Sequence, residues 1–148
     1  MLNNNQALRA ARQGRAIHKY ADEGTVTGSF VVQTAAAMYY DIPAGKQVVV
    51  NLIMAGCHSV DEFASVYLVG CTEKAGAGSP TQFMHRATVT LGSKKDGNEL
   101  KMMEFMVPVV LKYSAGHRSV SMAVKATDSS TVVSYCWCGW VEDEGTLS

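Results

Sequence analysis

The sequence contains no long apolar segment and no excess of charge of either sign. No apolar run reaches the roughly 18 to 20 residues that a membrane-spanning helix requires, and the N-terminal stretch MLNNNQALRAARQGR lacks the apolar region of a secretion signal. The 13 basic residues balance 13 acidic residues, so the chain as a whole is not expected to bind a polyanion. We therefore expect a protein made in a cytoplasm, with neither a membrane nor a nucleic acid as its partner.

Motifs of common enzyme classes are also absent. The chain has no G-x-S-x-G, H-E-x-x-H or Walker sequence. The segment GAGSPT from Gly76 begins like a dinucleotide-binding fingerprint but fails at its third glycine. His58, Asp61 and Glu62 lie close enough in sequence to form an acid–base cluster, although a polar loop explains them equally well. We expect no enzymatic activity and no cofactor.

The four cysteines are not needed as cross-links, because a domain of 148 residues buries enough surface to be stable without them. In the segment YCWCGW, strand alternation places Cys136 and Cys138 on one sheet face and Tyr135 and Trp137 on the other. We expect the two thiols to be reduced and to point into the core. They are poor partners for each other, since residues two apart on a strand are separated by about 7 Å.

Two arrangements of the cysteines are alternatives to core packing. One is a disulfide that joins Cys136 or Cys138 to Cys57 or Cys71. The other is a zinc site that includes Cys57, His58 and Cys71, although the C-x-C spacing lacks the usual C-x2-C knuckle. The remaining histidines, at positions 18, 85 and 117, show no paired spacing and are expected to be surface or hydrogen-bonded side chains. No metal ligand is assigned.

Short alternating or β-branched runs, separated by turn-like segments, fill the chain after its N-terminal stretch. This rhythm predicts an all-β, jelly-roll-like sandwich of about eight antiparallel strands. The expected strands cover residues 25–40, 46–55, 62–72, 83–92, 100–112, 114–126 and 131–141.

Several strands carry more detailed expectations. In the first, Gly28 marks a bulge, and the three alanines at 35–37 mark close packing. The nearly continuous apolar run 46–55 should lie centrally in a sheet, and Pro108 demands an edge, a bulge or a break. Turns are expected at DIPAGK and at the dipeptide Asp96-Gly97. The last two strands are expected to pair as a hairpin.

An N-terminal arm, residues 1–22, precedes the predicted sandwich domain, residues 23–148. Helix or disorder is expected over residues 3–20, and Gly14 weakens such a helix by about 1 kcal/mol. Basic residues at spacings of three and four would share one helical face, and they are the partner-binding residues that we expect: Arg9, Arg12, Arg15 and Lys19. Acids gather instead near the C-terminus, which suits head-to-tail contacts or docking of the arm on an acidic neighbour. Deletion of residues 1–19 is expected to leave the sandwich folded but to weaken assembly.

The composition predicts apolar surface that a partner covers. Hydrophobic residues make up 47% and charged residues 18% of the chain, the latter below the roughly 25% of an average domain. Met102, Met103 and Met106 lie close together and favour an adaptable apolar surface. Five aromatic residues could instead form a platform for sugar or single-stranded nucleic acid: Tyr39, Tyr40, Phe63, Trp137 and Trp140. We expect these residues to lie in the core or at a subunit interface.

The C-terminal segment YSAGHRSVSMAVKATDSSTVVSYCWCGWVEDEG resembles the closing hairpin of jelly-roll domains in tailed-phage virion proteins. With its small size and basic arm, the whole chain resembles a capsid decoration (cement) protein. That resemblance implies a structural virion protein on the capsid surface, whose jelly-roll body oligomerises, often as a trimer. Its partners would be the major capsid protein and further copies of itself, and its arm would reach across neighbouring capsid subunits.

The alternative function is a receptor- or glycan-binding module of a phage tail. Such a module needs exposed aromatic side chains beside the loops at residues 56–61 or 73–82. An enzyme of the cupin kind would need a histidine-rich strand cluster, which the sequence lacks.

Overall fold

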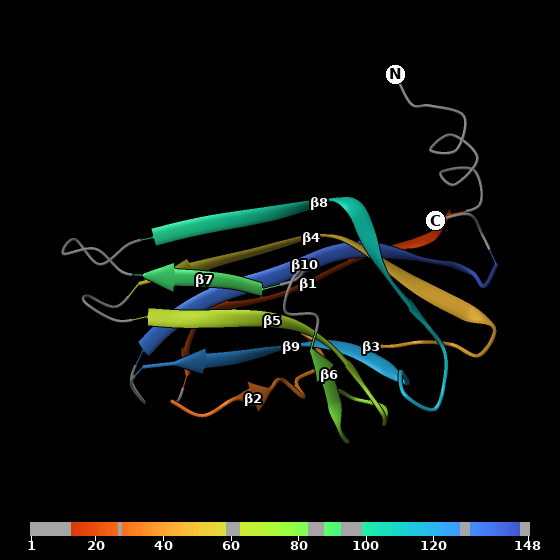
Figure 1. The fold of residues 1–148 in the computed structure, drawn as a ribbon, viewed down its shortest axis with the longest axis horizontal. Coiled ribbons are helices and arrows are strands. Elements are labelled where there is room, and N and C mark those ends of the chain that lie inside the picture. The colour runs from red at the N-terminus through yellow and green to blue at the C-terminus, as the bar shows by residue number, and fades with distance from the viewer. Residues whose placement is uncertain are drawn as a thin grey trace.

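The computed structural model describes residues 13–26, 28–58, 63–82, 88–92, 99–127 and 131–145, and these form ten β-strands without a helix (Figure 1). Accordingly, none of the described residues belongs to a helix able to cross a membrane. The strands are β1 (Gln13–Val26), β2 (Val31–Val32), β3 (Tyr40–Asp41), β4 (Lys46–Cys57), β5 (Phe63–Cys71), β6 (Pro80–Gln82), β7 (Thr88–Gly92), β8 (Glu99–Lys112), β9 (Ser119–Ala126) and β10 (Thr131–Asp143).

The strands form two antiparallel sheets. Sheet A has the order β1-β10-β4-β8; sheet B has the order β2-β9-β5-β6, with β3 also paired to β9 and β7 to β5. If β2 and β3 count as one position and β6 and β7 as another, the eight positions pair first with last, second with seventh, third with sixth and fourth with fifth. This nested pairing is the order of a jelly roll. The fold class predicted from the sequence is confirmed.

The core lies between the two sheets. The predicted central strand is confirmed as β4, which pairs with β10 on one side and β8 on the other. It contributes Val48, Val50 and Ile53, none of which is exposed. Trp137 of β10 is also fully buried, and its indole Nε1 donates a hydrogen bond of 2.8 Å to the carbonyl oxygen of Met38. That bond satisfies the polar atom of the largest side chain in the core.

A bulge in the middle of sheet A changes which side chains face the core. Val50 pairs with Gly139 and Val109, whereas Leu52 pairs with Cys138 and Glu104, so Asn51 lies between two regular stretches. Before the bulge the even-numbered residues of β4 face the core, and after it the odd-numbered ones do. Residues 105–108 lie opposite Asn51 on the edge strand β8, so Pro108 sits on an edge and in an irregularity, as predicted.

The predicted single strand over residues 25–40 is wrong. β1 ends at Val26, β2 has two residues, and residues 35–38 form a turn in which the amide of Met38 donates to the Ala35 carbonyl at 2.9 Å. The three alanines are exposed rather than closely packed. Their side chains offer little apolar area to hold a strand against the core, whereas Met38 is fully buried and anchors the segment.

The predicted hairpin of the last two strands is also wrong. β9 belongs to sheet B and β10 to sheet A. Each is already paired on both sides, β9 with β5 and with β2 and β3, and β10 with β1 and β4. Because their backbone groups are used by other strands, the two strands lie in opposite sheets, as the seventh and eighth positions of a jelly roll do.

The predicted N-terminal arm overlaps the sandwich. Residues 13–22 belong to β1, which runs antiparallel to β10 from the pair Gln13 and Glu142 to the pair Val26 and Thr131. A helix over residues 13–20 is therefore a wrong prediction, and residues 3–12 lie outside the described residues. The segment AIHKY alternates in exposure, with Ile17 buried between exposed Ala16 and exposed His18. This period of two favours a strand over a helix, because the alternation of a strand places Ile17 in the core.

We expect Gly139→Ala to destabilise the protein by at least about 2 kcal/mol, because an added Cβ would overlap the carbonyl oxygen of Val49 on the paired strand. Gly116→Ala is the matched control, since the nearest atom to its Cβ would be Ser114 Oγ at 3.8 Å. Urea unfolding measures both changes. A Gly139→Ala variant as stable as the control would contradict the tight bulge.

Deletion of residues 1–19 is now expected to lower the unfolding midpoint, since it removes half of β1 from its pairing with β10. Ile17→Ala isolates the core contribution and should cost about 2 to 5 kcal/mol. Thermal unfolding followed by circular dichroism tests both variants. An unchanged midpoint in both would mean that β1 does not contribute to the sandwich.

Candidate functional site

Of the basic residues expected to bind a partner, only Lys19 has a side chain that the structure describes. Lys19 lies on β1, where its Nζ donates a hydrogen bond of 3.0 Å to the carbonyl oxygen of Ala36 in the same chain. Arg9 and Arg12 lie outside the described residues, as does the side chain of Arg15.

Two of the C-terminal acids have partners within the chain. Glu142 is almost fully buried and accepts hydrogen bonds from Gln47 Nε2 at 2.7 Å and Trp140 Nε1 at 3.0 Å. Asp143 forms an ion pair with Lys46. These two carboxylates therefore have partners at one end of the sandwich of their own chain.

The predicted alternative zinc set is not assembled. Cys57 lies in the main core on β4, whereas Cys71 lies on β5 in a second cluster with Val69 and Ala123. His58 lies within 2.9 Å of Ser134 Oγ, and Asp61 and Glu62 lie outside the described residues. None of the four cysteines forms a disulfide.

The expectation that Cys136 and Cys138 point into the core is wrong. Tyr135 and Trp137 occupy the core side of β10, and the two thiols lie on the outer face of sheet A. The alternation was correct, but the choice of face was not. Tyr and Trp side chains remove far more apolar surface from water than two thiols do, so burial of the aromatic pair decides the face.

Three rows of side chains cross the middle of this outer face, following the strand register. The first contains Ser134, Gly56 and Leu100. The second contains Tyr20, Cys136, Met54 and Met102, and the third contains His18, Cys138, Leu52 and Glu104. We call the apolar members of these rows the outer band: Tyr20, Leu52, Met54, Leu100 and Met102.

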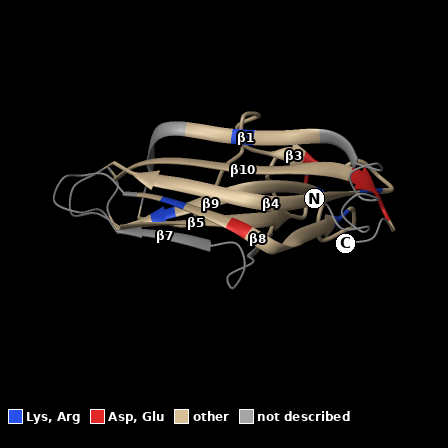
Figure 2. Cartoon of the chain, turned by 90° about the horizontal axis from the view of Figure 1, so that it is seen from above, with Lys and Arg blue, Asp and Glu red and all other residues tan. Residues whose placement is uncertain are grey.

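The outer band leaves large apolar side chains in water. Tyr20 is 58%, Leu100 70% and Met102 62% exposed. Beyond them on the edge strand β8, Met106 and Val107 project from the irregular segment and are also exposed. Among the described residues of the three rows, Glu104 carries the one permanent charge. Figure 2 shows the same distribution, with long uncharged stretches along β10 and β4.

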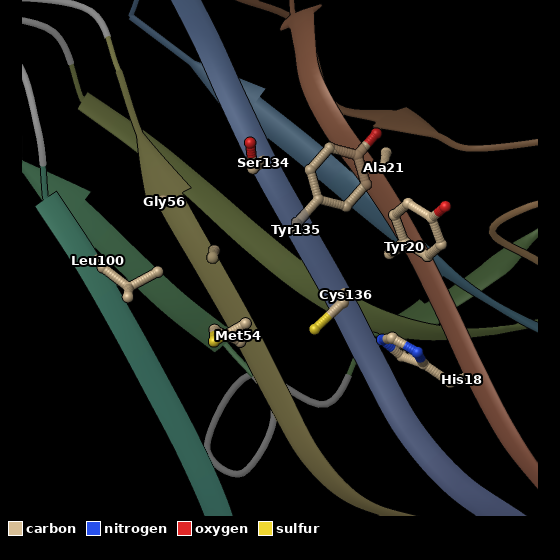
Figure 3. A pocket seen from close by; sticks show the side chains of 10 residues that line it. His18, Tyr20, Ala21, Met54, Gly56, Leu100, Ser134, Tyr135 and Cys136 are labelled. Atoms are coloured by element: carbon tan, nitrogen blue, oxygen red, sulfur yellow. The ribbon is translucent and has the colours of Figure 1, made fainter.

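A groove of about 270 Å³ runs across the outer band (Figure 3). His18 and Tyr20 of β1 form one wall, Met54 and Leu100 lie towards the other, and Cys136 lies between them. The His18 and Tyr20 rings stack with centroids 5.6 Å apart and planes inclined by 28°. The groove is therefore mostly apolar, with the His18 imidazole in the β1 wall and the Cys136 thiol next to it on β10.

The same side of the groove gathers three potential metal ligands. A ring nitrogen of His18 and the sulfurs of Cys136 and Cys138 all lie within 4.8 Å of one another. Burial raises the pKa of both thiols; the neighbouring Cys138 raises the pKa of Cys136 further, while a hydrogen bond from the Met54 amide lowers it. Both thiols therefore hold their protons at neutral pH in the metal-free chain.

The five aromatic residues considered as a platform are dispersed. Trp137 is in the core, Tyr39, Tyr40 and Trp140 are half-buried, and Phe63 is exposed on β5 of sheet B. Tyr20, whose exposed ring lines the groove, was not among the predicted site residues, and neither were His18 and Leu100. The alternation in AIHKY was the available signal for Tyr20 and His18.

Comparisons with known proteins give no family. No family model matches the chain, and no curated protein matches it. Among 25 matching chains of solved structures, one is described as "Bacillus endospore appendages form a novel family of disulfide-linked pili"; it is 9% identical, with 92% of this chain and 94% of that chain covered and a TM-score of 0.37. Another, described as "CBM4 structure and function", is 13% identical, with 86% and 71% covered and a TM-score of 0.34. Scores this low carry no functional argument.

The hydroxyl of Tyr135, on the buried face of β10, should make the stability of the protein depend on pH. Burial raises the pKa of Tyr135 from 10.0 to about 12. The unfolded chain therefore releases this proton at a lower pH than the folded chain does. The contribution of this group to the free energy of unfolding is fully present below pH 10 and is lost as the pH rises towards about 12. Urea unfolding at pH 9 to 11 should show a smaller loss in Tyr135→Phe than in the unmodified protein. Equal losses would contradict burial of the hydroxyl.

Proposed function

We propose that the protein is a structural virion subunit that decorates and stabilises a phage capsid, and that it docks on the major capsid protein through the outer band. The observation that carries this proposal is the exposure of three apolar side chains on one sheet face, Leu100 and Met102 on β8 and Tyr20 across Cys136 and Met54 on β1. The resemblance of the chain to capsid decoration proteins supplies the identity of the partner.

An exposed apolar band of this kind favours a protein partner. Burial of one Leu or Met side chain contributes roughly 1.5 to 3 kcal/mol, so a partner that covers the band gains from several side chains at once. Met54 and Met102 are direct cross-strand neighbours, and flexible methionine side chains adapt to the shape of a partner. Exposed contiguous apolar surface commonly marks an interaction site.

The geometry favours docking by the sheet face and not by strand addition. Both edge strands of sheet A, β1 and β8, carry residues of the band. β1 has register shifts at residues 13–16 and 21–24, and the irregular segment of β8 at residues 105–108 contains Pro108. Proline and bulges interrupt the row of backbone groups that an added strand would need. The partner therefore contacts side chains of the outer band.

Because many copies of the subunit would bind one capsid, the small apolar area of the outer band can be sufficient for stable attachment. Copies of one subunit on a lattice, or a trimer of subunits, multiply a modest affinity because later contacts form at high effective concentration. A homotrimer, as the resemblance implies, would present three outer bands to neighbouring capsid subunits.

The test is co-sedimentation of the purified protein with capsid shells from the same source. Leu100→Lys and Met102→Lys each place a charge in the band, and we expect at least tenfold weaker binding, equivalent to about 1.4 kcal/mol. Phe63→Lys is the matched control, since Phe63 is 54% exposed but lies on sheet B. It should bind like the unmodified protein.

Two outcomes would contradict the proposal. Binding that is equally weak in the Phe63→Lys control would show that the outer band is not the docking surface. Absence of shell binding by the unmodified protein, together with binding on a glycan array, would favour the tail-module alternative.

A further inference from the structure

The pairing of the first and last strands brings a histidine beside two cysteines. His18 of β1 lies directly opposite Cys138 of β10, and Tyr20 lies opposite Cys136. Residues two apart on a strand share a face, so the side chains of His18, Cys136 and Cys138 all lie on the outer face of sheet A. Their ligand atoms lie within 4.8 Å of one another.

The chemistry of this set is selective. Thiolate sulfur and imidazole nitrogen are the ligands of zinc, whereas Mg²⁺ and Ca²⁺ require oxygen. Zn–S bonds of about 2.3 Å and Zn–N bonds of about 2.0 Å place two ligands of one tetrahedral ion about 3.5 to 4 Å apart. The three atoms therefore need to approach by at most about 1 Å, which rotation of the exposed His18 ring and the Cys138 side chain can provide.

We propose that His18, Cys136 and Cys138 bind one Zn²⁺ ion, with its fourth position open towards the groove. On binding, the two thiols release their protons to solvent and the ion takes their place. The fourth ligand is then water or a group from a docked partner. This proposal does not depend on the capsid function.

The surroundings suit a metal site better than a disulfide. The Met54 amide donates to the Cys136 sulfur, and Cys136 and Cys138 are hydrogen-bonded to each other. A backbone N–H bond to sulfur can persist in the thiolate and orient it as a ligand, whereas the bond between the two thiols is lost when both protons leave. A disulfide between residues two apart would span about 7 Å of backbone, beyond the favourable separation of cysteine Cα atoms.

An ion at this position would tie β1 to the sheet. The site lies in the regular stretch of β1, between register shifts at residues 13–16 and 21–24. Among the described strands, β1 pairs with β10 alone and so forms an edge of sheet A. Zinc would therefore cross-link the edge strand to the centre of sheet A and should raise the stability of the metal-bound protein.

The test uses the full chain, reduced with a phosphine and freed of metal with a chelator. Co²⁺ is titrated as a spectroscopic substitute for zinc and is then displaced by Zn²⁺. We expect one Co²⁺ per chain, with thiolate-to-cobalt charge-transfer absorption and the d–d bands of tetrahedral Co²⁺. Excess Zn²⁺ should abolish these bands and raise the thermal midpoint.

Variants assign the ligands. Cys138→Ser should abolish the charge-transfer band and the thermal shift, and His18→Gln should weaken zinc binding at least tenfold. His18 is exposed, so its replacement should not disturb the metal-free fold. His58→Gln is the matched control for the exposed histidine and Cys57→Ala for the cysteine; both should bind zinc like the unmodified protein.

Three results would overturn the proposal. The first is no thiolate–cobalt band in the unmodified protein. The second is a band that persists in Cys138→Ser, which would place the ion elsewhere. The third is tight binding of Cu⁺ with no binding of Zn²⁺, which would refute the assignment of the metal.

Discussion

Burial of Trp137 between the two sheets is the constraint on which the functional surface depends. Its indole is fully buried and hydrogen-bonded to the Met38 carbonyl, so β10 can present only one face to the core. Every second residue must then point outward, and this places Cys136 and Cys138 on the outside of sheet A. The bulge at Asn51 changes the inward-facing residues of β4 from even-numbered to odd-numbered ones. β4 stays paired with β10 on both sides of the bulge, where Gly139 lies close to the Val49 carbonyl.

The pairing of β1 with β10 completes that surface. It closes the jelly roll by joining the first strand to the last, and it places Tyr20 and His18 next to the two thiols. β4 and β8 add Met54, Leu100 and Met102 on the other side. An apolar band and a cluster of soft metal ligands thus lie next to each other on one face, so a partner docked on the band would also cover the open side of the proposed zinc site.

The sequence predicted what local pattern controls and missed what long-range pairing controls. Apolar periodicity was sufficient for β4 and β5, and the chemistry of proline was sufficient for the irregular edge at Pro108. The face of β10 could not be chosen from alternation alone, because both of its faces carry residues that are commonly buried. The basic spacing before residue 20 suggested a helix, whereas the core position of Ile17 and the pairing with β10 produce a strand. His18 and Cys138 are 120 residues apart, so no local signal could join them.

Alkylation of the cysteines in the folded protein, resolved site by site by mass spectrometry, tests the central claim most directly. Cys138 is half-exposed on the outer face, whereas Cys57 and Cys71 are fully buried. The account predicts that Cys138 reacts much faster than these two in the free, metal-free protein, and that its reaction slows when the protein is bound to capsid shells. Equal rates at all three sites, or no protection of Cys138 on the shells, would contradict it.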